Sequence, residues 1–451
     1  MAVIAPFKGL TYNFEKLGDA AKLVAPPYDV ISDEEQEEYH DAHPNNVIRL
    51  ILGRKKTGDS DWDNRYTRSA DCLKRWESED ILIRADYPSI YLTSHKYDPG
   101  DGSGKRVRWG FIALVRVEDE GSDVILPHER TFSAHKNDRL KLMRACNAQL
   151  SQVFALYSDP EGLILNLLKK SGAEPPQVSF DFKDGTSHSM WPIRDQDVFK
   201  KVADSMVGKS IFIADGHHRY ETSRNFRNIM RVRHGVGPGN RSYEYIMMYL
   251  TDMNDEGLTI LPSHRLIKKQ NEFKLDFFLE KAKKWFDIDK LPISKSGRDD
   301  QVQKIKQGLE EKGSKTPAFG LYCRKGAGYY ILSLKPGAMD QMEEVLHPSL
   351  KKLDVIVLSR LILQKSLGFT REDLDNETLF HYNSNLADSI SLVDSGLYEM
   401  TFLLNPTKID QVKEVANNSL IMPRKSTYFY PKVLTGLVFN KIDPHEIIQV
   451  F

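Results

Sequence analysis

Apolar and polar residues recur with two different periods along the chain, and these periods predict a mixture of strands and helices. Short apolar or β-branched runs predict strands at 88–95, 107–118, 153–157, 210–215, 243–253 and 258–267. The stretch YDPGDGSGK separates the first two runs, so they are expected to form a hairpin. Helical spacing predicts helices at 135–147 and 217–234, and Gly235 follows the second at a favourable position to end it.

The pattern changes at about residue 270, where charged helical segments become frequent. Helices are predicted at 273–286, 300–312, 337–346, 353–367, 384–394 and 408–417, and strands at 318–323 and 329–335. The fold class expected is mixed α/β (α+β). At about 150 residues per domain, 451 residues suggest two or three units. The predicted regions are 1–120, a mixed α/β part; 121–270, a core; and 271–451, a C-terminal α/β part.

Composition narrows the classes of function. Lys and Arg number 63 and Asp and Glu also 63, so the chain has no net charge to attract nucleic acid or an anionic membrane, and neither is expected as a partner. No apolar run approaches the roughly 18 residues that span a bilayer. The three cysteines, Cys72, Cys146 and Cys323, show no disulfide or zinc spacing, which is typical of a reducing cytoplasm.

The segment 210–230 is the most informative part of the sequence. An apolar strand runs into Asp215, Gly216 allows a tight turn, and His217, His218 and Arg219 open a helix. The first turn of a helix presents N–H groups and a positive dipole end to an anion. Arg219 adds a planar donor group that matches phosphate oxygens. The segment therefore predicts a phosphate or phosphoryl-transfer site.

Several roles remain open for the acid and the histidines. Asp215 can orient a histidine, hold Mg²⁺ or accept a proton from a substrate hydroxyl, and it can also simply cap the helix. His217 and His218 are candidate catalytic residues. Because neighbouring residues do not share a helix face, the two histidines are not expected to bind one metal ion together.

Two further blocks combine acids, cations and hydroxyls. The first block follows the strand-like run VIL at 124–126. In it, Glu129 is a candidate general base and His128 and Arg130 are candidate phosphate ligands. Lys136 and Arg139, which follow, are further candidate phosphate ligands. Near the C-terminus, Lys425, Ser426, Thr427 and Lys432 resemble the lysine–hydroxyl pair of a P-loop without its glycines. Surface salt bridges or a solvated loop would explain both blocks equally well. Asp29 and Asn46 are candidate substrate ligands, or residues that fix turns.

The sequence IADGHHRYET resembles the Asp-Gly-His-x-Arg motif of the ParB/sulfiredoxin-like superfamily, which includes partition proteins, sulfiredoxins and free-serine kinases. This resemblance implies a ParB/sulfiredoxin-like core with additional α/β elements, and nucleotide phosphates at the motif. His217 stands where sulfiredoxin has its cysteine.

A second resemblance covers nearly the whole chain. It rests on APPYDVIS (25–32), HPNNVIRL (43–50), HERTF (128–132), KNDRLKLMRA (136–145), ADGHHRYET (214–222) and MPRKSTYFYPKVLTGL (422–437). These blocks are similar to those of a bacterial and archaeal family called a domain of unknown function, number 1015. The family name implies no chemistry.

The residues and the superfamily resemblance together predict a phosphoryl-transfer enzyme. The resemblance points to free serine or O-phosphoserine as substrate, with ATP or ADP as nucleotide and Mg²⁺ as metal, and leaves the kinase and phosphatase directions open. The alternative is a nucleotide-binding switch or a DNA-associated protein of the ParB type, without metabolic catalysis. The oligomeric state is not predicted.

Overall fold

The protein is described here by a computed structural model that covers all residues except 101, 130–132, 173, 238, 269–272, 293–296, 325–327, 343–344 and 377. It divides into two compact units. Unit 1 comprises 1–127, 131–259 and 429–451, and unit 2 comprises 128–130 and 260–428. The chain leaves unit 1 in β13 (Thr259–Leu261) and returns in β20 (Tyr428–Tyr430).

Unit 1 is built on one mixed sheet with the strand order β6-β11-β8-β12-β5-β4-β10-β9, in which β1 also pairs with β5. The strands are β1 (Ile4–Ala5), β4 (Ile90–Tyr97), β5 (Arg106–Arg116), β6 (Ile125–Leu126), β8 (Val153–Tyr157), β9 (Val178–Asp181), β10 (Ser187–Ile193), β11 (Ile211–Asp215) and β12 (Tyr245–Asp252). β4 and β5 form the predicted antiparallel hairpin. Strands from both sides of the predicted limit at residue 120 share this sheet.

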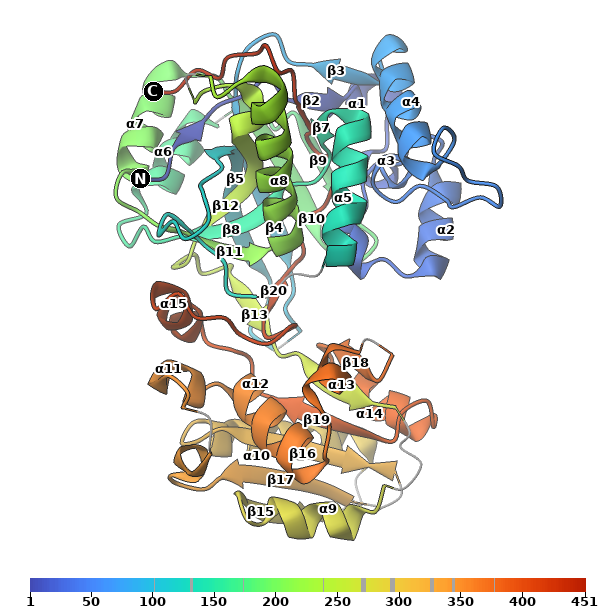
Figure 1. Cartoon of the computed structure of the whole chain (residues 1–451), viewed down its shortest axis with the longest axis vertical. Helices are drawn as coiled ribbons and strands as arrows, with labels where there is room; N and C mark the ends of the chain where they lie inside the picture. Colours follow the sequence, from blue (N-terminus) through green and yellow to red (C-terminus); the bar gives the residue numbers. More distant parts are fainter. Residues whose placement is uncertain are drawn as a thin grey trace. The chain divides into compact units, whose positions relative to one another are not determined.

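Helices surround the sheet of unit 1 (Figure 1). They are α1 (Phe14–Leu17), α2 (Asp33–Ala42), α3 (Ile48–Ile51), α4 (Arg65–Ser78), α5 (Ser133–Cys146), α6 (Leu163–Ser171), α7 (Gln196–Met206) and α8 (His217–His234). Leu168 of α6 and Val202 of α7 are buried against one face of the sheet, among Phe111, Val153 and Leu250. Two small ribbons pair β2 (Leu10–Tyr12) with β3 (Leu82–Arg84), and β7 (Ala148–Gln149) with β21 (Asn440–Lys441).

α5 and α8 lie side by side and run in the same direction (Figure 1). Lys136 of α5 pairs with Glu221 of α8. One to two turns further along α5, Leu140 and Met143 pack against the apolar cluster that contains Phe226 and Met230 of α8. This packing fixes the start of α8 relative to α5.

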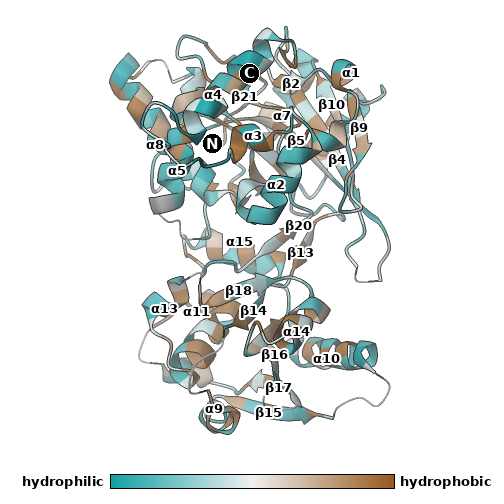
Figure 2. Cartoon of the chain, turned by 90° about the vertical axis from the view of Figure 1, so that its right-hand side faces the viewer, coloured by the Kyte–Doolittle hydropathy of each residue, from teal (hydrophilic) through white to brown (hydrophobic). Residues whose placement is uncertain are grey.

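Unit 2 carries a second sheet with the order β15-β17-β16-β19-β14-β18. Its strands are β14 (His264–Ile267), β15 (Phe286–Leu291), β16 (Ala318–Cys323), β17 (Gly328–Leu334), β18 (Phe380–Asn383) and β19 (Met400–Leu404). Its helices are α9 (Leu275–Ala282), α10 (Arg298–Gly313), α11 (Pro348–Lys351), α12 (Asp354–Val357), which continues as a π-helix over Leu358–Ser366, α13 (Arg371–Asp375), α14 (Leu386–Asp394) and α15 (Ile409–Asn417). In Figure 2, hydrophilic and hydrophobic residues alternate around α10, which buries Ile305 and Leu309.

The mixed α/β class predicted from the sequence is confirmed. Within the described ranges, no helix combines the length and the apolar character needed to cross a membrane.

Candidate functional site

The turn between β11 and α8 has the predicted form. Ile211 to Ala214 are buried, and Asp215 is the last residue of the strand. The pairing of β11 with β8 is irregular between Ile213 and Asp215. Gly216 adopts φ +92°, and α8 begins at His217. The apolar strand thus delivers a carboxylate to the start of an 18-residue helix.

Two cations share the carboxylate of Asp215. Nη2 of Arg219 lies 3.5 Å from Oδ2, and Nζ of Lys432 lies 3.4 Å from the same oxygen. The side chains of Asp215, Arg219 and Lys432 are 17%, 10% and 14% exposed. The structure therefore brings together three of the residues predicted for the phosphate site, although Lys432 comes from the C-terminal segment.

The guanidinium group of Arg219 folds back over Gly216. A Cβ atom on Gly216 would lie only 2.8 Å from Nε of Arg219. Nη1 donates a hydrogen bond to the carbonyl oxygen of Gln152. Arg219 thus ties the turn to the residue before β8, and only glycine fits beneath it.

The two histidines differ in their surroundings, as expected for neighbours on a helix. His217 is buried, whereas His218 is half-buried. The ring of His218 lies 5.0 Å, centre to centre, from the ring of His135 on α5. Nζ of Lys136, also on α5, is 2.8 Å from Oε2 of Glu221. The helix α5 therefore lines the side of the turn with a second imidazole and a cation.

A second polar cluster lies beside Arg219 in unit 1. The guanidinium carbon of Arg139 is 4.0 Å from the centre of the Tyr28 ring, and Nη1 of Arg139 donates to the carbonyl oxygen of Ile51. Tyr28, Arg139 and Arg219 line one small cavity of about 40 Å³, which is room for roughly one water molecule. Burial and the neighbouring carboxylate of Asp29 raise the pKa of Tyr28 to about 12, against the opposing charges of Arg139 and Arg219.

Asp138 holds this cluster together. Its carboxylate accepts hydrogen bonds from Nε of Arg139 at 2.7 Å and from the hydroxyl of Tyr66 at 2.6 Å, and it pairs with Arg65. Burial raises the pKa of Asp138, but Arg139, Tyr66 and Arg65 outweigh burial and hold that pKa below its usual value. Sequence reasoning missed Tyr28, Asp138, Arg65 and Tyr66. Tyr28 and Asp138 lie inside blocks that it had already selected, PPYD and KNDR.

The two predicted substrate ligands lie in different environments. Asp29 is exposed in a short turn after Pro27. Asn46 is fully buried, where Nδ2 donates to the carbonyl oxygens of Lys22 and Val24 and Oδ1 accepts from the N–H of Ile48. These bonds fix the backbone around Asn46, and its role toward a substrate stays a prediction.

In unit 2, His128 and Glu129 from one of the two further blocks contact Thr427 and Ser426 from the other. Nε2 of the buried His128 is 3.3 Å from Oγ1 of Thr427, and Oε1 of Glu129 accepts a hydrogen bond from the N–H of Ser426. Oγ of Ser426 donates to the carbonyl oxygen of Pro423. Lys425 has φ +53°, and its carbonyl oxygen accepts from Nη2 of Arg265. Arg130 lies outside the described residues. Catalytic or phosphate-binding roles for these residues stay predictions.

Metal binding at the turn would depend on Asp215. No group of three or more His, Cys, Asp or Glu side chains arranged to hold a metal ion occurs in the described part of the chain. Mg²⁺ is commonly held by one or two carboxylates together with substrate phosphate oxygens and water. A single carboxylate next to the predicted phosphate site fits that manner of binding, and the role of Asp215 as a metal ligand stays a prediction.

Comparison with solved structures finds several that are distantly similar to this chain. A conserved hypothetical protein from Pyrococcus furiosus has 11% identity and a TM-score of 0.35, and the match covers 72% of this chain and 95% of that one. A variant of a free serine kinase in complex with ADP has 12% identity and a TM-score of 0.36, over 75% and 97%. SbnI from Staphylococcus aureus, with a C-terminal truncation, has 10% identity and a TM-score of 0.33, over 72% and 85%.

No protein with a curated description is similar enough to count as a match. A family model does match, over residues 4–356, and its description is "Protein of unknown function (DUF1015)". This match covers most of the chain and agrees with the resemblance seen in the sequence blocks. The chain belongs to the DUF1015 family.

Proposed function

We propose that this protein is a phosphoryl-transfer enzyme acting on free serine or O-phosphoserine, with the nucleotide phosphates of ATP or ADP bound at the start of α8. The observation that carries the proposal is the position of Asp215 at the start of α8 between Arg219 and Lys432. Phosphoryl transfer requires cations for the phosphate oxygens and one group that positions the nucleophile. This turn supplies both.

The residues have distinct roles in the proposed site. Lys432, whose side chain is 14% exposed, is the cation that a phosphate group would meet. Arg219 is tied to Gln152 and folded over Gly216, so it acts mainly by holding the turn. The N–H groups of the first turn of α8 and the dipole of this long helix favour a negatively charged group in front of them.

Asp215 is proposed as the general base. In the kinase direction the serine hydroxyl oxygen forms a bond to the terminal phosphorus of the nucleotide. The bond from that phosphorus to its bridging oxygen breaks, the shortened nucleotide leaves, and the hydroxyl proton passes to the carboxylate of Asp215. In the phosphatase direction a water oxygen forms a bond to the phosphorus of O-phosphoserine, and the bond from that phosphorus to the serine oxygen breaks. Asp215 takes a proton from the water and returns it to the departing serine oxygen, so that serine and inorganic phosphate are released. Bound Mg²⁺ would supply charge to offset the phosphate oxygens.

The decisive experiment compares the full-length protein with Asp215→Asn. Phosphoserine formation from serine with ATP or ADP, and phosphate release from phosphoserine, are followed by ³¹P NMR with Mg²⁺ present. Loss of a catalytic base typically lowers the rate 10²–10⁴-fold, and we expect a loss in that range. Asp204→Asn on the exposed side of α7 is the matched control and should retain full activity.

Nucleotide binding and turnover, measured together, separate the proposed enzyme from the alternative, a nucleotide-binding switch. Removing a charged hydrogen bond costs about 1.5–3 kcal/mol, so Lys432→Met should weaken nucleotide binding about 10- to 150-fold. A protein that binds nucleotide through Lys432 but turns over neither substrate would instead be a nucleotide-operated switch. Full activity of Asp215→Asn would remove this carboxylate from the chemistry, since the substitution takes away its negative charge and keeps nearly the same shape.

A further inference from the structure

A large pocket lies in unit 1 at the opposite end of α5 and α8 from the Asp215 turn. Its volume is about 960 Å³, which is enough for a ligand of nucleotide size. The loop 55–64 and the first turn of α4 form one wall, and Lys141, Arg144 and Arg233 near the ends of α5 and α8 form the other. Arg233 is 16 residues beyond His217, so this end of the pocket is about 24 Å from the start of α8 at 1.5 Å per residue.

Cations predominate around this pocket. Lys55, Lys141, Arg144 and Arg233 line it, all are exposed, and none of them pairs with a carboxylate in the described ranges. The pocket contains two acids. Asp59 is already paired with Arg68, which leaves only Asp61 to offset four charges. This local surplus stands out because the whole chain has equal numbers of acidic and basic residues.

The other arginines of α8 show that such a surplus is not general along this helix. Arg219 pairs with Asp215, Arg224 with Glu120, Arg227 with Asp119 and Arg231 with Glu244. These pairs account for four of the five arginines in the stripe 219–233. Arg233 differs because it faces the pocket.

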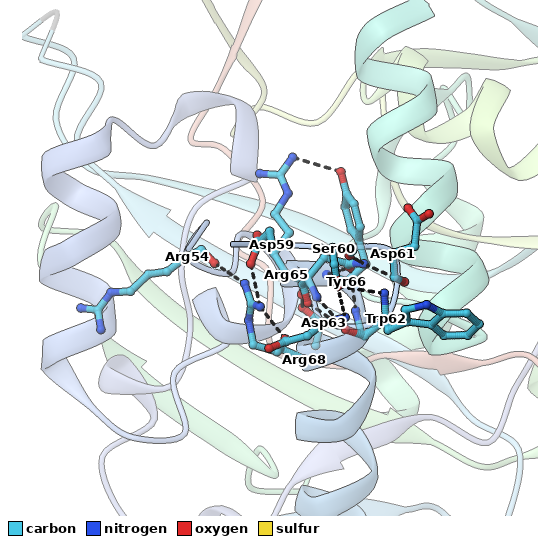
Figure 3. A network of polar contacts seen from close by, with 12 residues as sticks. Arg54, Asp59, Ser60, Asp61, Trp62, Asp63, Arg65, Tyr66 and Arg68 are labelled. Atoms are coloured by element: carbon cyan, nitrogen blue, oxygen red, sulfur yellow. Dashed lines mark hydrogen bonds and ion pairs between the residues drawn. The ribbon is translucent and has the colours of Figure 1, made fainter. Parts of the chain in front are cut away.

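The loop wall of the pocket is braced by its own side chains (Figure 3). Arg68 holds Asp59 at 2.8 Å, Asp63 at 2.7 Å and the carbonyl oxygen of Arg54 at 3.0 Å. Nδ2 of Asn64 donates to the carbonyl oxygen of Ser60 at 2.8 Å, and its Oδ1 caps α4. A wall that is already ordered loses little conformational entropy when a ligand binds.

Figure 3 shows Trp62 directed away from the braced part of the loop. Its side chain is 91% exposed, and it does not line the pocket itself. An exposed indole on an ordered loop offers a flat surface on which a base can stack.

Another explanation for three of the cations is their place near helix ends. Cations in the last turn of a helix are favoured by its dipole, which applies to Arg144 and Arg233 and more weakly to Lys141. The helix dipole does not account for Lys55, which lies on the loop. It also does not explain why the four cations line the same pocket. The two explanations predict different responses to a phosphate ligand.

We propose that this pocket binds a multiply phosphorylated small molecule, through Lys55, Lys141, Arg144 and Arg233. The ligand would be an inorganic polyphosphate chain or the triphosphate of a nucleotide, since both present the same closely spaced anionic oxygens to lysine and arginine. This site is separate from the proposed phosphoryl-transfer site and does not depend on it.

The test is calorimetric titration of the full-length protein with tripolyphosphate and, separately, with ATP. We expect Arg144→Gln/Arg233→Gln to weaken tripolyphosphate binding at least tenfold, and Lys55→Gln/Lys141→Gln to do the same. Arg224→Gln removes one charge from α8 outside the pocket and should change the affinity less than twofold. Lys432→Met should leave this binding event intact, which distinguishes it from binding at the Asp215 turn.

The comparison of ATP with tripolyphosphate identifies the source of the phosphate chain. If ATP binds more tightly than tripolyphosphate, the ligand is a nucleotide, and loss of that difference in Trp62→Ala would identify the exposed indole as the surface on which the base stacks. Equal affinities indicate that the phosphate chain is sufficient. The proposal is overturned if tripolyphosphate does not bind, or if both double variants bind it as well as Arg224→Gln does.

Discussion

Gly216 is the residue on which the geometry of the proposed site depends most directly. Its φ of +92° disfavours any side chain, and a Cβ atom would also strike the guanidinium group of Arg219. Gly208, just before β11, has φ +78° but open space around it. These two glycines therefore allow backbone strain and displacement of Arg219 to be measured separately.

We expect Gly208→Ala to lower the free energy of unfolding by about 1–2 kcal/mol, the cost of left-handed backbone for a residue with a Cβ atom. Gly216→Ala should cost more, because Arg219 must also leave its place against Gln152. Urea unfolding followed by circular dichroism gives both values. Equal losses in the two variants would show that Arg219 moves aside freely.

Buried histidines give unit 1 a predictable response to acid. His95 and His188 are almost fully buried, and their rings lie 4.8 Å apart. Burial, helped by Arg108, lowers the pKa of His188 to about 4, although Asp184 and Asp181 oppose this. Burial, Arg108 and His188 lower the pKa of His95 as well. Both imidazoles are therefore neutral in the folded protein at neutral pH.

The sign of the effect follows from where protons bind. Below pH about 6.5, His188 binds a proton in the unfolded chain but not in the folded protein. The free energy of unfolding is therefore highest above this pH and decreases as the pH falls toward about 4. Each histidine contributes a slope of about 1.4 kcal/mol per pH unit. The free energy of unfolding is measured by urea unfolding at pH 7, 6 and 5. It should fall less steeply with decreasing pH in His188→Leu than in the wild type. An equal dependence on pH in the two proteins would contradict this assignment.

At the scale of elements, the packing of α5 against α8 connects the turn to the pocket. Met230 is buried with Phe226, Tyr243 and Ile442, whereas Val232, two residues on, is 88% exposed. Met230→Ala should reduce the free energy of unfolding by about 2–5 kcal/mol, because the substitution leaves a cavity. Val232→Ala should change it by less than about 0.5 kcal/mol. A loss below 1 kcal/mol for Met230→Ala would mean that the two helices repack easily.

Elements with strong local signals were predicted almost to the residue. The strands β8 and β16 and the helix α8 have the expected bounds, because apolar runs or helical periodicity end there at clear breakers. The segment 337–346 was predicted as a helix, but among its described residues the helical part is a short 3₁₀ turn at Ala338–Gln341, after Gly337 with φ +71°. Met342 then adopts an extended conformation. Local periodicity did not reveal how early this segment ends.

Contacts between distant parts of the chain were not predictable in the same way. The ion pair of Asp215 with Lys432 joins residues 217 positions apart, and the pairing of β11 with β8 and β6 sets where that carboxylate lies. Lys432 entered the candidate list through its chemistry, not through any sign that it approaches Asp215. Tyr66 and Asp138 were missed for the same reason, since their hydrogen bond spans 72 positions.

At the scale of the whole molecule, the C-terminal segment is part of unit 1 although unit 2 precedes it in sequence. Phe429 packs against Phe154, and Nε2 of Gln152 donates to the carbonyl oxygen of Leu434. The two ends that unit 2 separates also approach each other within unit 1. Tyr97 bonds to Oγ1 of Thr259 at 2.5 Å, and its ring lies 5.3 Å from that of Tyr430.

This arrangement predicts that unit 1 folds without residues 260–428. A chain in which a short Gly/Ser linker joins Thr259 to Phe429 should unfold cooperatively, because the closing residues already meet at Tyr97 and the sheet and its helices are complete. Truncation after Tyr428 should instead prevent folding, since it removes Lys432 and the contacts of Phe429 and Leu434. Circular dichroism and urea unfolding of the two chains check this.

Nucleotide binding by the linked chain tests where the proposed phosphate site lies. If this chain binds nucleotide and Lys432→Met weakens that binding, the site belongs to unit 1 alone, and unit 2 contributes something other than the phosphate contacts. A linked chain that does not fold would show that unit 1 needs unit 2 for its stability.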